Sequence, residues 1–224
     1  MMDHLYGICI AFLIPLVVCV YYAEENLKEV SGFKKKLEVI FKRSKTEYMI
    51  LSISCLACLG TYFISHHVYQ HADVFWTYRW EIAMGILVPI AVIDFKYQII
   101  PNKLLLIGLV FGVVTIALQV VKASDYVVSV LGNAFIGMIA GGGIFFLASV
   151  FVRNGIGAGD IKMFLFLGLL VAFRGIFNVL LYSMVVSAIT AIILVICKKK
   201  TMKDELPLAP FTLIGVVISI LFGV

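Results

Sequence analysis

Long apolar runs alternate with short polar connections along most of the chain. A helix that crosses a membrane needs about 20 mostly apolar residues, because the hydrocarbon core is about 30 Å thick. By this measure the pattern predicts eight spanning helices. They cover residues 5–22, 48–65, 80–93, 104–121, 126–152, 161–173, 176–197 and 208–224. The third and sixth runs are the shortest, and each has an aspartate at one end.

The composition agrees with this interpretation. Hydrophobic residues make up 62% of the 224 residues and charged residues only 14%, whereas soluble domains carry roughly 25% charged residues. So few charged residues would not cover the surface of a water-soluble protein of this size. The high share of apolar residues also excludes a disordered chain. We therefore exclude a soluble enzyme and a nucleic-acid binder, and we expect an all-α, polytopic transmembrane helical bundle that contacts the lipid bilayer.

Positive charges are distributed unevenly between the two sides of this predicted bundle. Of the 18 lysines and arginines, 15 fall in the first, third, fifth and seventh connections, and the others are Arg79, Lys122 and Arg174. Because cytoplasmic loops are enriched in Lys and Arg, these four connections should face the cytoplasm, and both termini should lie outside. We divide the chain into a two-span region, residues 1–79, with a short basic cytoplasmic loop, and a six-span core, residues 80–224.

The basic loop, residues 23–47, allows two interpretations. Apolar residues recur in it at three- and four-residue steps, and lysines occupy much of the remaining face. It is either a helix that lies on the inner membrane surface or a solvated connector.

Two of the 13 acidic residues, Asp94 and Asp160, stand at the predicted cytoplasmic ends of apolar spans. Most of the others lie in connections, and we expect Glu81 to pair with Arg79, two residues away. Acids at membrane depth are costly and usually functional. Two nearby carboxylates do not readily both ionise, so they share a proton, and one acts as a base while the other acts as an acid. Such a pair can activate water against a peptide carbonyl without a metal or a covalent intermediate.

Both aspartates lie beside segments that interrupt a helix. Asp94 is followed by Ile100-Pro101-Asn102, and Pro101 disfavours helix at the residue before it, so the helix should end there. Asp160 follows a segment with glycine at positions 155, 157 and 159. Taken alone, these glycines either let an extended peptide approach the carboxylate closely or form a tight turn in which Asp160 caps the next helix. The presence of two acids at one membrane face favours the first interpretation.

These two segments resemble the active-site motifs of the type IV prepilin peptidases, which are membrane aspartyl proteases of the GxGD kind. The matching segments are Asp94 with Ile100-Pro101-Asn102, and then Gly157-Ala158-Gly159-Asp160-Ile161-Lys162. Residues 206–211 are similar to the proline-rich start of the family's last span, and the resemblance covers about residue 81 to the C-terminus. It implies that Asp94 and Asp160 are the catalytic pair. Gly157 and Gly159 would shape the active-site loop, and Pro101, Asn102 and Lys162 would support it.

The resemblance also implies a substrate and a location. The substrate would be a prepilin or pseudopilin, with a short basic leader, a cleavage point and then an apolar helix. Cleavage would occur at the cytoplasmic face of a prokaryotic inner membrane, which agrees with the charge distribution. The product would enter a type IV pilus, a secretion pseudopilus or a DNA-uptake filament.

One departure from the family concerns the first cytoplasmic loop. Many bacterial relatives have a larger domain there, with two CxxC pairs that bind zinc, and they also methylate the new amino terminus. Residues 23–47 contain no cysteine. We therefore expect cleavage without methyl transfer, and we expect neither a metal nor a cofactor. His67 and His71 have a spacing that suits a metal on a helix, but we expect a polar interfacial loop there.

Two other interpretations are less well supported. An intramembrane protease of the presenilin or signal-peptide-peptidase kind pairs the glycine motif with a tyrosine–aspartate motif, whereas Ile93 precedes Asp94 here. A proton-coupled transporter would also carry membrane acids. However, the sequence shows no inverted repeat, and both acids lie at one face instead of at the midplane.

Overall fold

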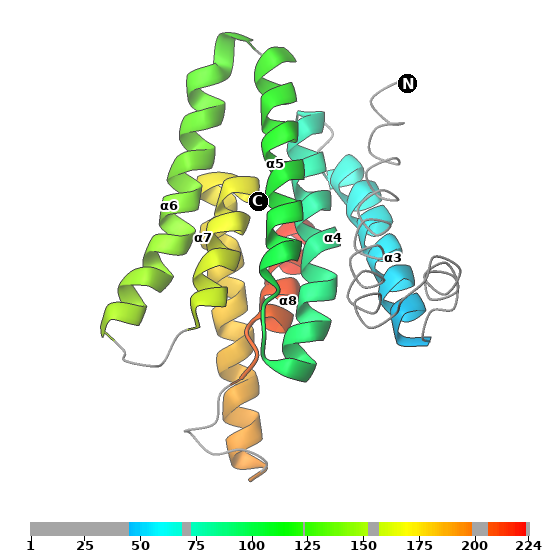
Figure 1. The fold of residues 1–224 in the computed structure, drawn as a ribbon, viewed down its shortest axis with the longest axis vertical. Helices are drawn as coiled ribbons and strands as arrows, with labels where there is room; N and C mark the ends of the chain where they lie inside the picture. Colours follow the sequence, from blue (N-terminus) through cyan, green and yellow to red (C-terminus); the bar gives the residue numbers. More distant parts are fainter. Residues whose placement is uncertain (1–44, 69–72, 123, 152–156, 199–205, 223–224) are drawn as a thin grey trace, which may run out of the picture.

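The computed structural model describes residues 45–68, 73–122, 124–151, 157–198 and 206–222. Within these ranges the chain forms six α-helices and one short 3-10 helix, and it contains no strand, so the predicted all-α fold is confirmed there. The elements are α3 (Lys45–Val68), α4 (Val74–Tyr97), α5 (Asn102–Lys122), η1 (Ser124–Tyr126), α6 (Val127–Phe151), α7 (Ala158–Ile196) and α8 (Ala209–Leu221) (Figure 1).

Three of these helices, α5, α6 and α7, are long and apolar enough to cross a membrane. Helix α3 contains a shorter apolar stretch, Ser52–Ile64, and α8 is a short apolar helix. Each predicted span from residue 48 onward coincides with a helix. The first predicted span, residues 5–22, and residues 23–44 of the basic loop lie outside the described residues. The count of eight spans and the outside placement of both termini stay predictions.

Helix α7 consists of two segments that fold back on each other. The break is at Ala172, whose φ of 60° and ψ of −173° are not helical. A Cβ atom placed on Gly141 of α6 would lie 2.5 Å from the carbonyl oxygen of Phe164 and 2.8 Å from Cγ1 of Ile176. In a straight helix those two residues would be about 18 Å apart, so the chain reverses at the break, as Figure 1 shows. This confirms the prediction of separate helical segments over residues 161–173 and 176–197.

The first segment of α7 packs closely on α6 through small residues. Gly137 of α6 lies against Gly168 of α7, and there is no room for a side chain between the two backbones. Nearer the start of α7, the ring of Phe164 stacks on that of Phe145, with ring centroids 4.2 Å apart. Close approach of this kind drives helix association in membranes, where apolar surface alone gives little driving force. The contacts fix the helix that carries Asp160.

Helix α4 starts six residues before the predicted span at residue 80, because Asp73 caps it: its carboxylate accepts the N–H of Phe75. The earlier start places Arg79 inside the bundle, where it is 3% exposed. Its Nε donates to the carbonyl oxygen of Leu170 over 2.6 Å. Carbonyl groups in the last turn of a helix lack intrahelical partners, and the break at Ala172 creates such an end. Arg79 therefore caps the first segment of α7.

Further bonds of Arg79 add a second carbonyl of α7 and a side chain of α5. Nη2 of Arg79 donates to the carbonyl oxygen of Leu169 over 3.4 Å, and Nη1 donates to Oε1 of Gln119 over 3.1 Å. The Nε2 of Gln119 in turn donates to Oδ2 of Asp73 over 2.8 Å. The side chains thus link α4, α5 and α7 at one end of the bundle.

The predicted pairing of Glu81 with Arg79 is wrong. Side chains two residues apart on a helix do not face each other, and Arg79 is directed to α5 and α7. Glu81 lies where α3 packs on α4, and the thiol of Cys58 donates to its backbone carbonyl over 3.6 Å. Glu81 is fully buried, and its two carboxyl oxygens have no hydrogen-bond partner within the described ranges.

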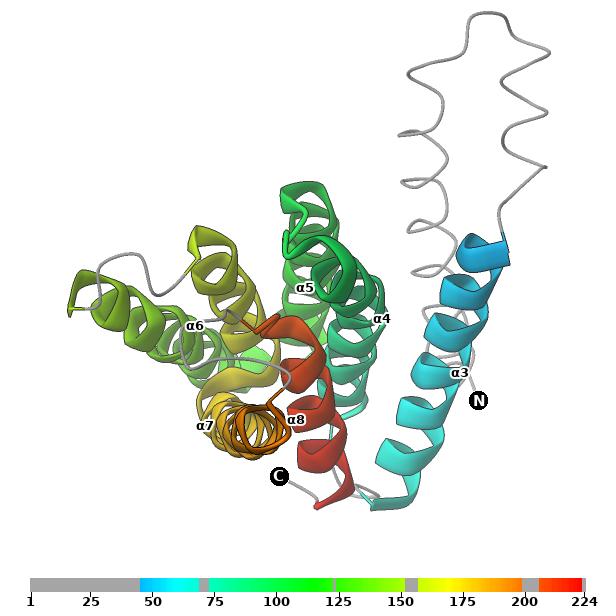
Figure 2. The ribbon, with the colours of Figure 1, turned by 90° about the horizontal axis from the view of Figure 1, so that it is seen from below.

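The opposite end of the bundle brings four helix ends together. Helix α8 lies beside α7 and also contacts α4, as the end view in Figure 2 shows. The C-terminus of α4 and the N-termini of α5, α7 and α8 therefore meet at the lower end in Figure 1. Both aspartates singled out from the sequence belong to these ends.

Candidate active site

Asp94 lies in the last turns of α4 and is 5% exposed. Its Oδ2 accepts the backbone N–H of Ala209, the first residue of α8, over 2.9 Å. The N-terminal end of a helix carries partial positive charge and free N–H groups, which stabilise an adjacent carboxylate. Helix α8 therefore gives a buried carboxyl group a partner that it needs away from water. The sequence contains no spacing that predicts this bond, because 115 residues separate its two ends.

Helix α4 ends within one turn after Asp94 and before Pro101, as the sequence predicted. Gln98 ends α4 in the left-handed conformation, with φ of 55°, and its N–H donates to the carbonyl oxygen of Asp94 over 2.8 Å. Helix α5 begins at Asn102, and the carbonyl of Pro101 accepts its first bond, from the N–H of Leu105. Pro101 thus stands where a missing N–H costs nothing.

Asp160 lies in the first turn of α7 and is half-buried. The helix begins three residues earlier than predicted, and Gly157 occupies the N-cap position, so the alternative in which Asp160 is the cap is wrong. The N–H of Asp160 donates to the carbonyl of Gly157 over 3.1 Å. A Cβ atom on Gly157 would lie only 3.2 Å from Oδ2 of Asp160. Glycine at this position leaves space beside the carboxylate.

Two contacts join the segment after Asp94 to the loop that carries Asp160. A Cβ atom on Gly159 would lie 3.0 Å from Cβ of Ile100, so the two backbones approach closely there. On the surface, Nζ of Lys162 donates to Oδ1 of Asn102 over 3.0 Å. The residues predicted to support the site therefore connect α5 with α7. This brings the segments that carry the two carboxyl groups to the same end of the bundle.

The described ranges contain no cluster of three His, Cys, Asp or Glu side chains that could hold a metal ion. His67 lies on the surface at the end of α3, and His71 lies outside the described residues. The cysteines that the structure describes are Cys55, Cys58 and Cys197, and all three are free thiols.

The fold and the site together define a helical membrane protein with acidic residues at one end of its bundle. Comparison with known families identifies the class of membrane protein. The sequence model of the type IV leader peptidase family matches residues 81–192, half of the chain, and the chain belongs to this family. The matched segment contains both aspartates and the Asn102–Lys162 pair.

A curated relative gives the same result. The chain is similar to the prepilin leader peptidase/N-methyltransferase of Bacillus subtilis (strain 168), with 26% identity over 143 residues. The match covers 62% of this chain and 54% of the relative, so the chain spans about half the length of that protein. No solved structure matches the chain. Membership of a peptidase family supports a protease, and apolar helices support a location in a membrane.

Proposed function

We propose that the protein is a prepilin leader peptidase: a membrane aspartyl endopeptidase in which Asp94 and Asp160 form the catalytic pair. It removes the basic leader of a type IV prepilin or pseudopilin at the cytoplasmic face of a prokaryotic inner membrane. The observation that carries the proposal is the direct connection between the two motif segments, through Ile100 with Gly159 and Asn102 with Lys162. Family membership adds to it.

The chemistry follows from two carboxyl groups that share one proton. The ionised group takes a proton from a water molecule, which attacks the scissile carbonyl carbon. The protonated group donates to the carbonyl oxygen and later to the departing amine. For Asp94, the backbone N–H of Ala209 at the start of α8 stabilises the ionised form.

The glycine loop would admit the substrate backbone. Gly157 is exposed, and the space beside it opens toward Oδ2 of Asp160. An extended peptide in that space would place its carbonyl group next to the carboxylate. The apolar helix that follows the cleavage point would remain in the bilayer, beside the apolar helices of the enzyme.

We further propose that cleavage needs neither zinc nor a methyl donor. The relative from Bacillus subtilis is named as a methyltransferase as well as a peptidase, whereas the first loop of this chain, residues 23–47, contains no cysteine. A structural zinc site requires four thiolate or imidazole ligands. The proposed peptidase chemistry uses only the two carboxyl groups.

The test is to incubate the purified full chain with a synthetic prepilin in detergent and measure the product by mass spectrometry. We expect a mass loss equal to the leader, in the presence of a chelator as well as in its absence. With labelled S-adenosylmethionine, the new amino terminus should stay unmethylated. An intact substrate would contradict the peptidase assignment, and a methylated terminus would contradict only the second proposal.

A further inference from the structure

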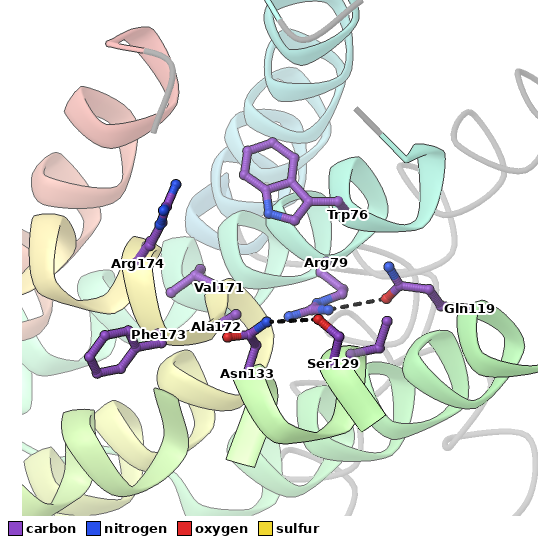
Figure 3. A pocket seen from close by; sticks show the side chains of 11 residues that line it. Trp76, Arg79, Gln119, Ser129, Asn133, Val171, Ala172, Phe173 and Arg174 are labelled. Atoms are coloured by element: carbon purple, nitrogen blue, oxygen red, sulfur yellow. Dashed lines mark hydrogen bonds between the residues drawn. The ribbon is translucent and has the colours of Figure 1, made fainter. Parts of the chain in front are cut away.

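A cavity of about 490 Å³ lies at the end of the bundle opposite Asp94 and Asp160 (Figure 3). Its walls are α4, α5, α6 and the bend of α7. Arg79 and Asp94 are 15 residues apart on α4, which corresponds to about 22 Å along the helix. The cavity is therefore separate from the proposed catalytic site, and the peptidase mechanism does not use it.

The cavity has a positive lining. Arg79 and Arg174 both line it, together with the polar side chains of Gln119, Ser129 and Asn133, and its described lining includes no acidic residue. The guanidinium of Arg79 lies near Gln119 and Ser129, and Arg174 lies on the far side of Val171 (Figure 3). The second segment of α7 also starts at this wall, and the start of a helix carries partial positive charge.

Arg79 is a buried cation whose hydrogen-bond partners are all neutral. It is 3% exposed, and its bonds go to two backbone carbonyls and an amide oxygen. Within the described ranges, the carboxylate of Asp73 acts on Arg79 electrostatically from a distance, and the hydrogen-bonded path between them runs through Gln119. Burial of a cation without a hydrogen-bonded countercharge is unfavourable. An anion in the cavity would supply that countercharge.

An apolar groove of about 860 Å³ adjoins the cavity, between α5 and α6. Its described lining is apolar throughout and includes Ala117, Val128 and Gly132. On α6, Val128 of the groove is next to Ser129 of the cavity, and Gly132 of the groove is next to Asn133. The polar and the apolar linings therefore lie on adjacent sides of the same helix.

We propose that the cavity and the groove form one binding site for a membrane phospholipid. The phosphate group binds beside Arg79, with the exposed Arg174 at the rim of the cavity, and an acyl chain fills the groove. Arginine presents N–H donors that match phosphate oxygens, and the groove matches a hydrocarbon chain. A free anion would leave the groove empty, and an apolar substrate helix would leave the arginines unpaired. By the charge distribution, the lipid comes from the outer leaflet.

Lipid binding at this site would also stabilise the fold. Arg79 holds the carbonyl groups at the bend of α7, so a phosphate that neutralises it also stabilises the bend. A ligand that binds only the folded state raises its stability by mass action. Phospholipid binding should therefore raise the unfolding temperature of the detergent-purified protein.

The experiment is native mass spectrometry of the full chain, titrated with dioleoylphosphatidylglycerol. Two variants alter the site without touching Arg79. Arg174→Glu places a negative charge at the phosphate, and Gly132→Leu fills the groove. A Cβ atom on Gly132 has no neighbour within 4 Å, so this variant should fold. The matched controls are Lys122→Glu, outside the cavity at the same end, and Gly143→Leu, whose Cβ atom would meet only Ile139 at 3.9 Å.

We expect the unmodified protein to bind one lipid tightly. Each site variant should lower the affinity about tenfold, which corresponds to about 1.4 kcal/mol. Both controls should bind the lipid with unchanged affinity. Dioleoylglycerol, which lacks the phosphate, should bind far more weakly. Equal binding by all five proteins would overturn the proposal. So would inorganic phosphate binding as tightly as the lipid, which would indicate a free-anion site. Loss of prepilin cleavage in Gly132→Leu with normal lipid binding would assign the groove to the substrate helix instead.

Discussion

The Nζ atom of Lys162 donates to Oδ1 of Asn102 over 3.0 Å, across 60 residues of sequence. Asn102 is the first residue of α5, and Lys162 lies in the first turns of α7. The bond therefore holds together the two helix starts that follow the proposed catalytic residues. It lies on the surface, where a hydrogen bond of this kind contributes about 0.5–1.5 kcal/mol.

A double-mutant cycle tests this bond. We expect Lys162→Met and Asn102→Leu each to lower kcat, because the loop that carries Asp160 loses a tether to the segment after Asp94. The double variant should be little worse than either single one, with a coupling energy of about 1 kcal/mol. The measurement is kcat and KM for prepilin cleavage by all four proteins. Fully additive effects would show that the two side chains do not act together.

The contact between Gly159 and Ile100 gives a second prediction. Gly159→Val would drive a branched side chain into Ile100, because even a Cβ atom would lie 3.0 Å from the Ile100 Cβ. We expect a loss of activity of roughly tenfold or more, since misplacement of a catalytic group by about 1 Å costs up to 10²-fold. The measurement is kcat on the same substrate.

A compensating change serves as the control for this prediction. Ile100→Ala shortens the opposing side chain, so the double variant Gly159→Val with Ile100→Ala should recover much of the lost activity. Gly143→Val, on α6, where a Cβ atom would meet only Ile139 at 3.9 Å, should be as active as the unmodified protein. If the double variant recovers nothing, the close approach is not the reason for glycine at position 159.

The Arg79 contacts predict a change in stability. Arg79→Met would leave the carbonyl groups of Leu169 and Leu170 and the amide of Gln119 without this donor. Because an unsatisfied buried polar group costs about 1–3 kcal/mol, the free energy of unfolding should fall by roughly 2–4 kcal/mol. Denaturant unfolding in detergent measures it. Arg174→Met, on an exposed residue, should change it much less. Equal losses in the two variants would contradict the role of Arg79 in holding the bend.

The sequence predicted the helices that apolar runs define. Helices α5 and α6 match the predicted spans 104–121 and 126–152 within two residues, because polar residues and a turn bound both runs. It also predicted the two motif segments and the end of α4 before Pro101. These features are local, because they depend on the residue types of one short segment.

The features that the sequence did not predict depend on tertiary contacts. Arg79 resembled a residue of the outer connection, but its guanidinium lies inside the bundle and donates to carbonyl groups freed at Ala172. The sequence predicted a break between residues 173 and 176, but not the Arg79 contacts that hold it. Likewise, the bond from Ala209 to Asp94 depends on how α8 packs on α4. Apolar periodicity alone cannot show which buried polar groups meet.

Asp94 and Asp160 are proposed to cleave the substrate together, and one measurement tests this most directly. Purified Asp94→Asn and Asp160→Asn are incubated with a synthetic prepilin, beside the unmodified protein and Asp125→Asn, an exposed acid at the opposite end. Because a shared-proton mechanism needs both groups, each of the first two variants should lose roughly 10²- to 10⁴-fold in rate while retaining its unfolding temperature within a few degrees. Asp125→Asn should cleave normally. Near-normal cleavage by a folded Asp94→Asn or Asp160→Asn protein would contradict the account.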